Sequence, residues 1–158
     1  MRYYLIDRVT ELDCGASARA VKAVTLTDEV LHDHFPGYPV MPGLLILEGA
    51  AQLAGFLLEM SVNREGEPLR RALLVQVADA RFHALAGPGE CLDYTAELES
   101  LLDTAARVRA RVSRGADRIA SATLVFSLQA IAWPRVHEQR REVYALWTRE
   151  LKGCPPIL

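Results

Sequence analysis

Strand-like runs of apolar residues occupy the second half of the chain, over residues 72–82, 91–101, 105–113 and 119–131. In the third run, arginines at positions 107, 109 and 111 alternate with small or aliphatic residues, the pattern of a strand with one wet face. Near the N-terminus, residues 3–9 and 17–26 also look extended and are separated by the turn signal Asp13-Cys14-Gly15. The pattern predicts a hairpin followed later by an antiparallel meander.

A nearly continuous apolar stretch runs from position 40 to 58 and predicts one long helix over residues 43–60. Pro42 suits the opening of this helix, because its missing N–H would have no partner in the first turn. Glu48 lies near the middle of the stretch, where a carboxylate in a membrane would cost about 2.5 to 3.5 kcal/mol. We therefore expect no membrane span, but a helix buried on all sides inside a soluble fold.

Two further segments of the chain remain to be interpreted. Residues 27–43 hold three prolines and two glycines, which predicts a shaped loop without a regular element. Residues 133–158 carry apolar positions at roughly helical spacing within charged surroundings, which predicts an amphipathic C-terminal helix. The order of hairpin, buried helix and meander is that of an α+β fold. We expect one domain over residues 1–132 and a helical extension over 133–158.

Composition agrees with a single soluble domain, since 51% of the 158 residues are hydrophobic and 24% are charged. Eighteen basic and 20 acidic residues give a net charge of −2, which argues against a nucleic-acid partner. The three cysteines, Cys14, Cys91 and Cys154, have neither disulfide-framework nor zinc-site spacing. Reduced thiols and a short apolar N-terminal run lead us to expect a cytoplasmic protein.

Candidate chemistry gathers between positions 34 and 52. His34 stands on the proline-stiffened loop, and a neutral imidazole there is a competent base. Glu48 lies on the apolar helix, where burial favours the protonated form that a general acid needs. The N–H of Gly43 lies at the helix start, where free donors favour developing negative charge. Gln52 follows Glu48 by four residues, on the same helical face, and could orient it.

Less specific readings stay open at this point. A loop histidine is often structural, and a glutamate in an apolar helix often finds a salt bridge. His32 and His34 could begin a metal site, but no further ligand has a suitable spacing, so we expect neither a metal nor a cofactor. The arginine row at 107, 109 and 111 fits a solvated strand face, or a surface for an acidic carrier protein.

The stretch from His34 to Gln52 resembles the active-site segment of the hot-dog-fold 3-hydroxyacyl-acyl-carrier-protein dehydratases, the FabZ and FabA family. The matching signature is His-Phe-Pro-Gly-x-Pro-x-x-Pro-Gly-x-Leu, followed by the acidic residue and the glutamine. Glu rather than Asp at position 48 is closer to the FabZ branch. The resemblance implies that His34 takes the α-proton, Glu48 protonates the leaving hydroxyl and the Gly43 amide holds the thioester oxygen. It also implies a substrate loop formed by Phe35, Pro36, Gly37 and Pro42.

The resemblance further implies a long central helix wrapped by an antiparallel sheet, with an extra C-terminal helix in this chain. It implies a homodimer, or a trimer of such dimers, in which each active site takes its histidine from one subunit and its acid from the other. The expected partner is an acyl carrier protein with a 3-hydroxyacyl chain, or the corresponding coenzyme A thioester. Two alternatives are a hot-dog acyl thioesterase and a non-catalytic acyl-binding subunit.

Overall fold

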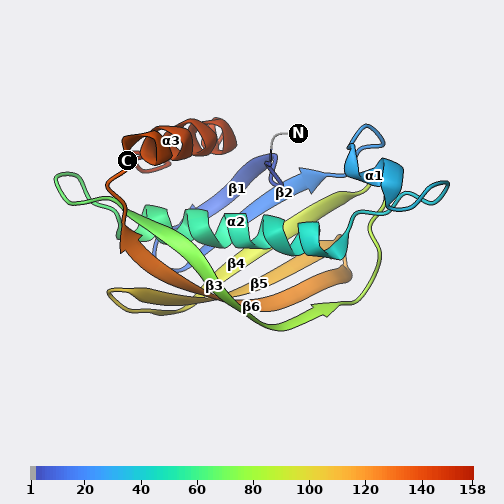
Figure 1. Ribbon diagram of the computed structural model, residues 1–158, viewed down its shortest axis with the longest axis horizontal. Coiled ribbons are helices and arrows are strands. Elements are labelled where there is room, and N and C mark those ends of the chain that lie inside the picture. Colours follow the sequence, from blue (N-terminus) through green and yellow to red (C-terminus); the bar gives the residue numbers. More distant parts are fainter. Residues whose placement is uncertain (1–2) are drawn as a thin grey trace.

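Six strands form one antiparallel sheet in the computed structural model, which describes residues 3–158 (Figure 1). Their order across the sheet is β1-β2-β4-β5-β6-β3, so β1 and β3 are the edges. The strands are β1 (Arg8–Asp13), β2 (Ser17–Ala23), β3 (Arg70–Phe82), β4 (Cys91–Leu101), β5 (Ala105–Arg114) and β6 (Asp117–Ala130). The predicted antiparallel meander is confirmed for β4, β5 and β6, whereas β3, the first of the four predicted runs, pairs with β6 at one edge and not with β4.

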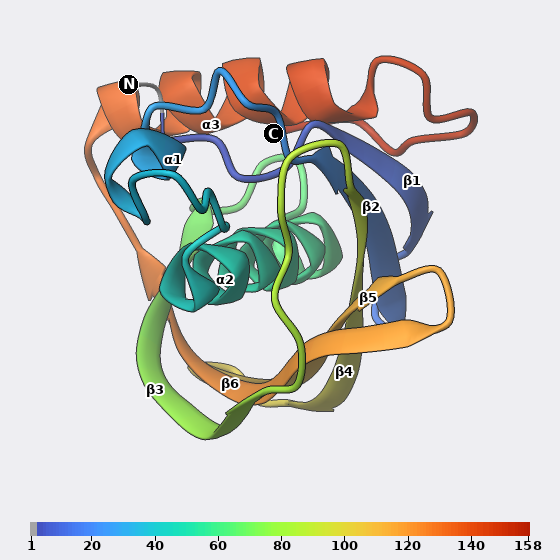
Figure 2. The same cartoon turned by 90° about the vertical axis from the view of Figure 1, so that its right-hand side faces the viewer.

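The central helix α2 (Gly43–Val62) lies in the curve of this sheet (Figure 2). Seen along the helix, the sheet curls from β1 around to β3, and the helix α3 (Pro134–Thr148) lies across the open side. Leu53, Ala54, Phe56, Leu57 and Leu58 have no accessible surface. The helix is long and apolar enough to cross a membrane, but 67% of its most apolar window is buried inside the protein. It is the core helix of a soluble α+β fold, as predicted.

The N-terminal prediction is wrong in its boundaries. The first strand begins at Arg8 instead of residue 3, and runs on to the turn at Asp13. Asp7 still donates its N–H to the carbonyl of Val21 in β2, but Tyr3 and Leu5 bond to the side chain of Gln52 on α2. Their aromatic and branched side chains therefore reflect packing on a helix and not strand pairing.

The proline-rich segment also differs from the prediction. A short helix, α1 (Val30–Asp33), precedes the first proline of the loop and buries Leu31. The prolines exclude regular structure only from their own neighbourhood, so a single helical turn fits before Pro36.

The C-terminal helix is confirmed, although it ends at Thr148 and the last ten residues form turns and extended chain. A buried ion pair lies beneath it. Glu59 of α2 and Arg71 of β3 are 1% and 2% exposed, and Arg71 Nη1 donates to Glu59 Oε2 at 2.9 Å. Tyr144 of α3 donates its hydroxyl to the same carboxylate at 2.8 Å, and Arg71 Nε donates to His137 Nδ1 at 3.0 Å. This cluster ties α3 to both the core helix and the sheet.

The arginine row of β5 lies on a solvated face. Arg107 and Arg109 both pair with Glu99 of β4, and Arg111 pairs with Glu97 at 2.8 Å. These are cross-strand ion pairs, and the arginines are about half exposed. Both observations agree with the interpretation of this row as a solvated strand face.

Candidate active site

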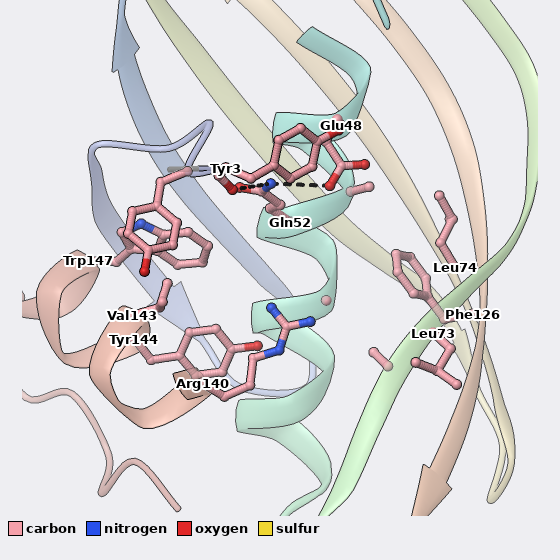
Figure 3. A pocket seen from close by; sticks show the side chains of 14 residues that line it. Tyr3, Glu48, Gln52, Leu73, Leu74, Phe126, Arg140, Val143, Tyr144 and Trp147 are labelled. Carbon is pink, nitrogen blue, oxygen red and sulfur yellow. Dashed lines mark hydrogen bonds between the residues drawn. The ribbon is translucent and has the colours of Figure 1, made fainter. Parts of the chain in front are cut away.

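A cavity of about 400 Å³ lies beside α2 and contains Glu48 (Figure 3). Its helical wall is formed by Glu48, Ala51, Gln52 and Gly55. The opposite wall is apolar, with residues of β3 and β6, and Figure 3 shows Leu73, Leu74 and Phe126 on that side. A concave, mainly apolar cavity with a few polar groups is typical of a small-molecule site.

Gln52 holds Glu48 in place. The Gln52 side-chain amide donates to Glu48 Oε1 at 3.1 Å and to the carbonyl of Tyr3 at 3.2 Å. Its own carbonyl oxygen accepts the backbone N–H of Leu5 at 3.0 Å. Four residues on a helix bring two side chains to one face, so the predicted contact between positions 48 and 52 is present. The structure shows in addition that the N-terminal segment contacts this pair, through the bonds of Gln52 to the backbone of Tyr3 and Leu5.

Gly43 is the first residue of α2, directly after Pro42, and the N–H at this position has no acceptor within the helix. A Cβ at Gly43 would lie 2.9 Å from two ring carbons of Phe82, the last residue of β3. The close approach of this aromatic ring explains why the helix begins with a glycine. It places the helix start against the end of the edge strand.

His34 is half-buried at the end of α1 and is held by its own loop. Its Nδ1 lies 3.0 Å from the carbonyl oxygen of Val40, and the Val40 N–H donates to the His34 carbonyl at 2.8 Å. A carbonyl only accepts, so Nδ1 carries the proton in this bond and the neutral ring keeps Nε2 as a free base. Phe35 stacks on the imidazole with ring centroids 4.2 Å apart.

The turn after His34 is tight. Phe35 and Tyr38 exchange two backbone hydrogen bonds, of 3.0 and 2.9 Å, around Pro36 and Gly37. Gly37 has a φ of 76°, a conformation that suits glycine. Phe35, Pro36 and Gly37 are exposed, so the loop presents its tip outward.

Within one chain, Glu48 and Gln52 line the same cavity, whereas His34 and Gly43 do not line it. Sequence reasoning also missed residues of the cavity from both ends of the chain, among them Tyr3, Arg140, Tyr144 and Trp147. The helical spacing of 140, 144 and 147 was a signal for a helix with one covered face, but not for the surface it covers.

Other kinds of site find no support in the described part of the chain. No group of three or more potential ligands is placed to hold a metal ion within residues 3–158. Cys14, Cys91 and Cys154 are all free thiols.

The sequence matches the family model of the FabA-like domain over residues 1–123. A relative named 3-hydroxyacyl-[acyl-carrier-protein] dehydratase FabZ, from Levilactobacillus brevis, is 37% identical over 125 residues, covering 79% of this chain and 82% of the relative. Further relatives with the same name are 32% to 42% identical. The resemblance read from His34 to Gln52 is thus confirmed over most of the chain.

Solved structures show the same fold. A hot-dog-like protein from Thermanaerovibrio acidaminovorans has a TM-score of 0.62 at 19% identity, covering 81% of this chain and 93% of its own. The dehydratase heterocomplex ApeI:P from Xenorhabdus doucetiae has a TM-score of 0.64 at 15% identity, covering 87% and 89%. The chain has a hot-dog fold with an added C-terminal helix, and it belongs to the FabA-like family.

Proposed function

We propose that this protein dehydrates a 3-hydroxyacyl thioester to the trans-2-enoyl thioester, in fatty-acid or polyketide-type biosynthesis. The observation that carries the proposal is the position of Glu48, held by Gln52 in the wall of a largely apolar cavity. The FabZ relatives support the same reaction. The chemistry needs an acid, a base and an oxyanion donor, and all three come from the protein itself.

Each group has one task. The free Nε2 of His34 takes the α-proton, and the electrons of that C–H bond form the new double bond. Protonated Glu48 donates to the 3-hydroxyl as the Cβ–O bond breaks, and water leaves. The N–H of Gly43 stabilises the thioester oxygen while it carries negative charge, an effect worth about 2.7 to 4 kcal/mol for one oriented donor. Proton exchange with solvent then restores the base and the acid.

The geometry of one chain supports a shared site. His34 and Gly43 lie outside the cavity that contains Glu48, so a second copy is needed to supply the base to this acid. The edge strand β3 is the surface for that copy, because Leu73, Leu74, Val75 and Val77 are 39% to 61% exposed. A long apolar edge strand is a template for pairing with another chain. We propose a homodimer in which two β3 strands pair and each subunit completes the other's site.

The proposed acyl partner is a carrier protein, and a basic hollow of about 280 Å³ supports its docking. Arg81, His83, Arg109 and Arg118 line this hollow on the outer face of the sheet, together with one acidic residue, Asp79. Arg81 immediately precedes Phe82, whose ring leaves no room for a Cβ at Gly43, so the hollow lies near the helix start. An acidic carrier would be steered to such a surface. A cytoplasmic location fits this role.

The test follows the loss of one water from a 3-hydroxyacyl thioester by mass spectrometry. His34→Ala and Glu48→Gln should each lower the rate by at least about 100-fold, as expected for a missing general base or acid. His32→Ala and Glu67→Gln serve as matched controls, since both residues are exposed and lie outside the cavity. Wild-type rates in folded His34 or Glu48 variants would refute the roles, and release of free thiol without an enoyl product would favour a thioesterase.

A further inference from the structure

Helix α3 turns one of its faces to the cavity that contains Glu48. Arg140, Val143, Tyr144 and Trp147 follow one another at helical spacing and all line the cavity. The family model ends at residue 123, so this wall lies outside the matched domain. The cavity of this chain is therefore shaped by an element of its own.

One member of this wall is a charged group without a close partner. The Arg140 side chain is 41% exposed, and its nearest ionic contact is from Nε to Glu59 Oε1 at 3.9 Å. Within residues 3–158, no hydrogen bond is found for its guanidinium. Figure 3 shows this side chain reaching from α3 toward α2, on the side of the cavity away from Glu48.

Glu59 has little capacity left to neutralise Arg140. Its carboxylate already accepts from Arg71 at 2.9 Å, from the Tyr144 hydroxyl at 2.8 Å and from the Ala72 N–H at 3.1 Å. Arg71 balances its charge in a buried pair. The positive charge of Arg140 is thus surplus to the cluster and is available to a ligand in the cavity.

The separation of Glu48 and Arg140, the polar groups at the two ends of the cavity, fits an acyl chain. The helical wall runs from Glu48 to Gly55, which is about 10 Å at 1.5 Å per residue, and Glu59 lies one turn further. A chain with its 3-hydroxyl at Glu48 that extends along α2 past Leu73 and Phe126 brings its far end to Arg140. A planar guanidinium recognises a carboxylate through paired hydrogen bonds.

We infer that Arg140 binds a terminal carboxylate on the acyl chain, so that the preferred substrates are 3-hydroxyacyl thioesters with a second carboxylate at the distal end. This inference rests on the proposed dehydratase function. It identifies Arg140 as a specificity-determining residue on the added helix.

The test compares two 3-hydroxyacyl thioesters of equal length, one ending in a methyl group and one in a carboxylate. The wild type should favour the carboxylate substrate by at least about tenfold in kcat/KM. Arg140→Gln should abolish this preference by lowering kcat/KM for the carboxylate substrate at least about tenfold more than for the methyl-ended one, and Arg140→Lys should retain part of it. Arg141→Gln removes a neighbouring exposed charge outside the cavity and should leave the preference unchanged.

A saturated thioester with a distal carboxylate gives a second readout that needs no catalysis. Calorimetry should show its affinity falling about tenfold in Arg140→Gln and remaining unchanged in Arg141→Gln. Equal kcat/KM for the two substrates in the wild type, or equal affinity of the analogue for wild type and Arg140→Gln, would overturn the inference. Absence of any enoyl product would instead contradict the dehydratase proposal, and the binding experiment would still decide the role of Arg140.

Discussion

The side chain of Gln52 donates to Glu48 at 3.1 Å while its carbonyl accepts the N–H of Leu5 at 3.0 Å. One amide thus connects the proposed acid to the segment that enters β1. The orientation of Glu48 depends on this connection, because the carboxylate has no other hydrogen-bond partner within the described residues.

Gln52→Ala should therefore lower kcat about tenfold with a smaller change in KM, which corresponds to one lost hydrogen bond of about 1.4 kcal/mol. The free energy of unfolding should fall by about 1 kcal/mol, since the Leu5 N–H loses its acceptor. Steady-state kinetics and urea unfolding measure the two effects. Gln129→Ala, at the exposed end of β6, is the matched control. A rise in KM with kcat unchanged would show that Gln52 only shapes the cavity.

Mixing two inactive variants tests the shared site. In a heterodimer of His34→Ala with Glu48→Gln, one of the two sites combines intact His34 with intact Glu48 if these residues come from different subunits. Random exchange of subunits should then restore about one quarter of the wild-type activity. Each variant alone is the control, and exchange is verified by native mass spectrometry. No recovery despite proven heterodimers would place both groups in one subunit.

Local signals in the sequence were sufficient for most of the fold. The continuous apolar run ending near Met60 requires burial on all sides, and the structure supplies that burial for α2. A strand is predicted from residue 3 because aromatic and branched residues favour strands. In the structure Gln52 binds the backbone of Tyr3 and Leu5, and the strand begins only at Arg8. Strand propensity describes only the local preference of a side chain, and here the tertiary contact with Gln52 outweighs it.

The distant contacts around α3 were not predictable in the same way. Glu59 reads as one more polar residue near the end of an apolar helix, and Arg71 as part of a charged turn. Their pairing joins elements through the tertiary fold, and Tyr144 reaches the pair from 85 positions away. The position of Arg140 in the cavity wall was not predictable either, because the path of α3 depends on this cluster of Glu59, Arg71 and Tyr144.

The buried pair gives a stability prediction. Glu59→Ala leaves Arg71 charged and buried, which should lower the free energy of unfolding by about 3 to 5 kcal/mol. Glu97→Ala removes one partner of an exposed pair with Arg111 and should cost less than about 1 kcal/mol. Urea unfolding compares the two. Since Glu59 also holds Tyr144, limited proteolysis should cut near α3 in the first variant and not in the second.

Two buried tyrosines predict a loss of stability in alkali. Burial raises the pKa of Tyr144 well above its ordinary value, with a further contribution from Glu59. Burial also raises the pKa of Tyr94, with a smaller contribution from Asp7. Above pH about 10 the unfolded chain loses these two protons while the folded protein keeps them. The free energy of unfolding should therefore fall by about 1.4 kcal/mol per pH unit for each tyrosine as pH rises beyond that point.

Phenylalanine variants separate this effect from general alkaline damage. Tyr94→Phe should reduce the slope by about half and cost nothing at neutral pH, because the Tyr94 hydroxyl is buried without a hydrogen-bond partner within residues 3–158. Tyr144→Phe should reduce the slope equally but cost about 1 to 2 kcal/mol at neutral pH, since Glu59 loses a donor. Tyr38→Phe, at a residue 64% exposed, should change neither quantity. A slope that is the same in all three variants would mean that other groups govern alkaline unfolding.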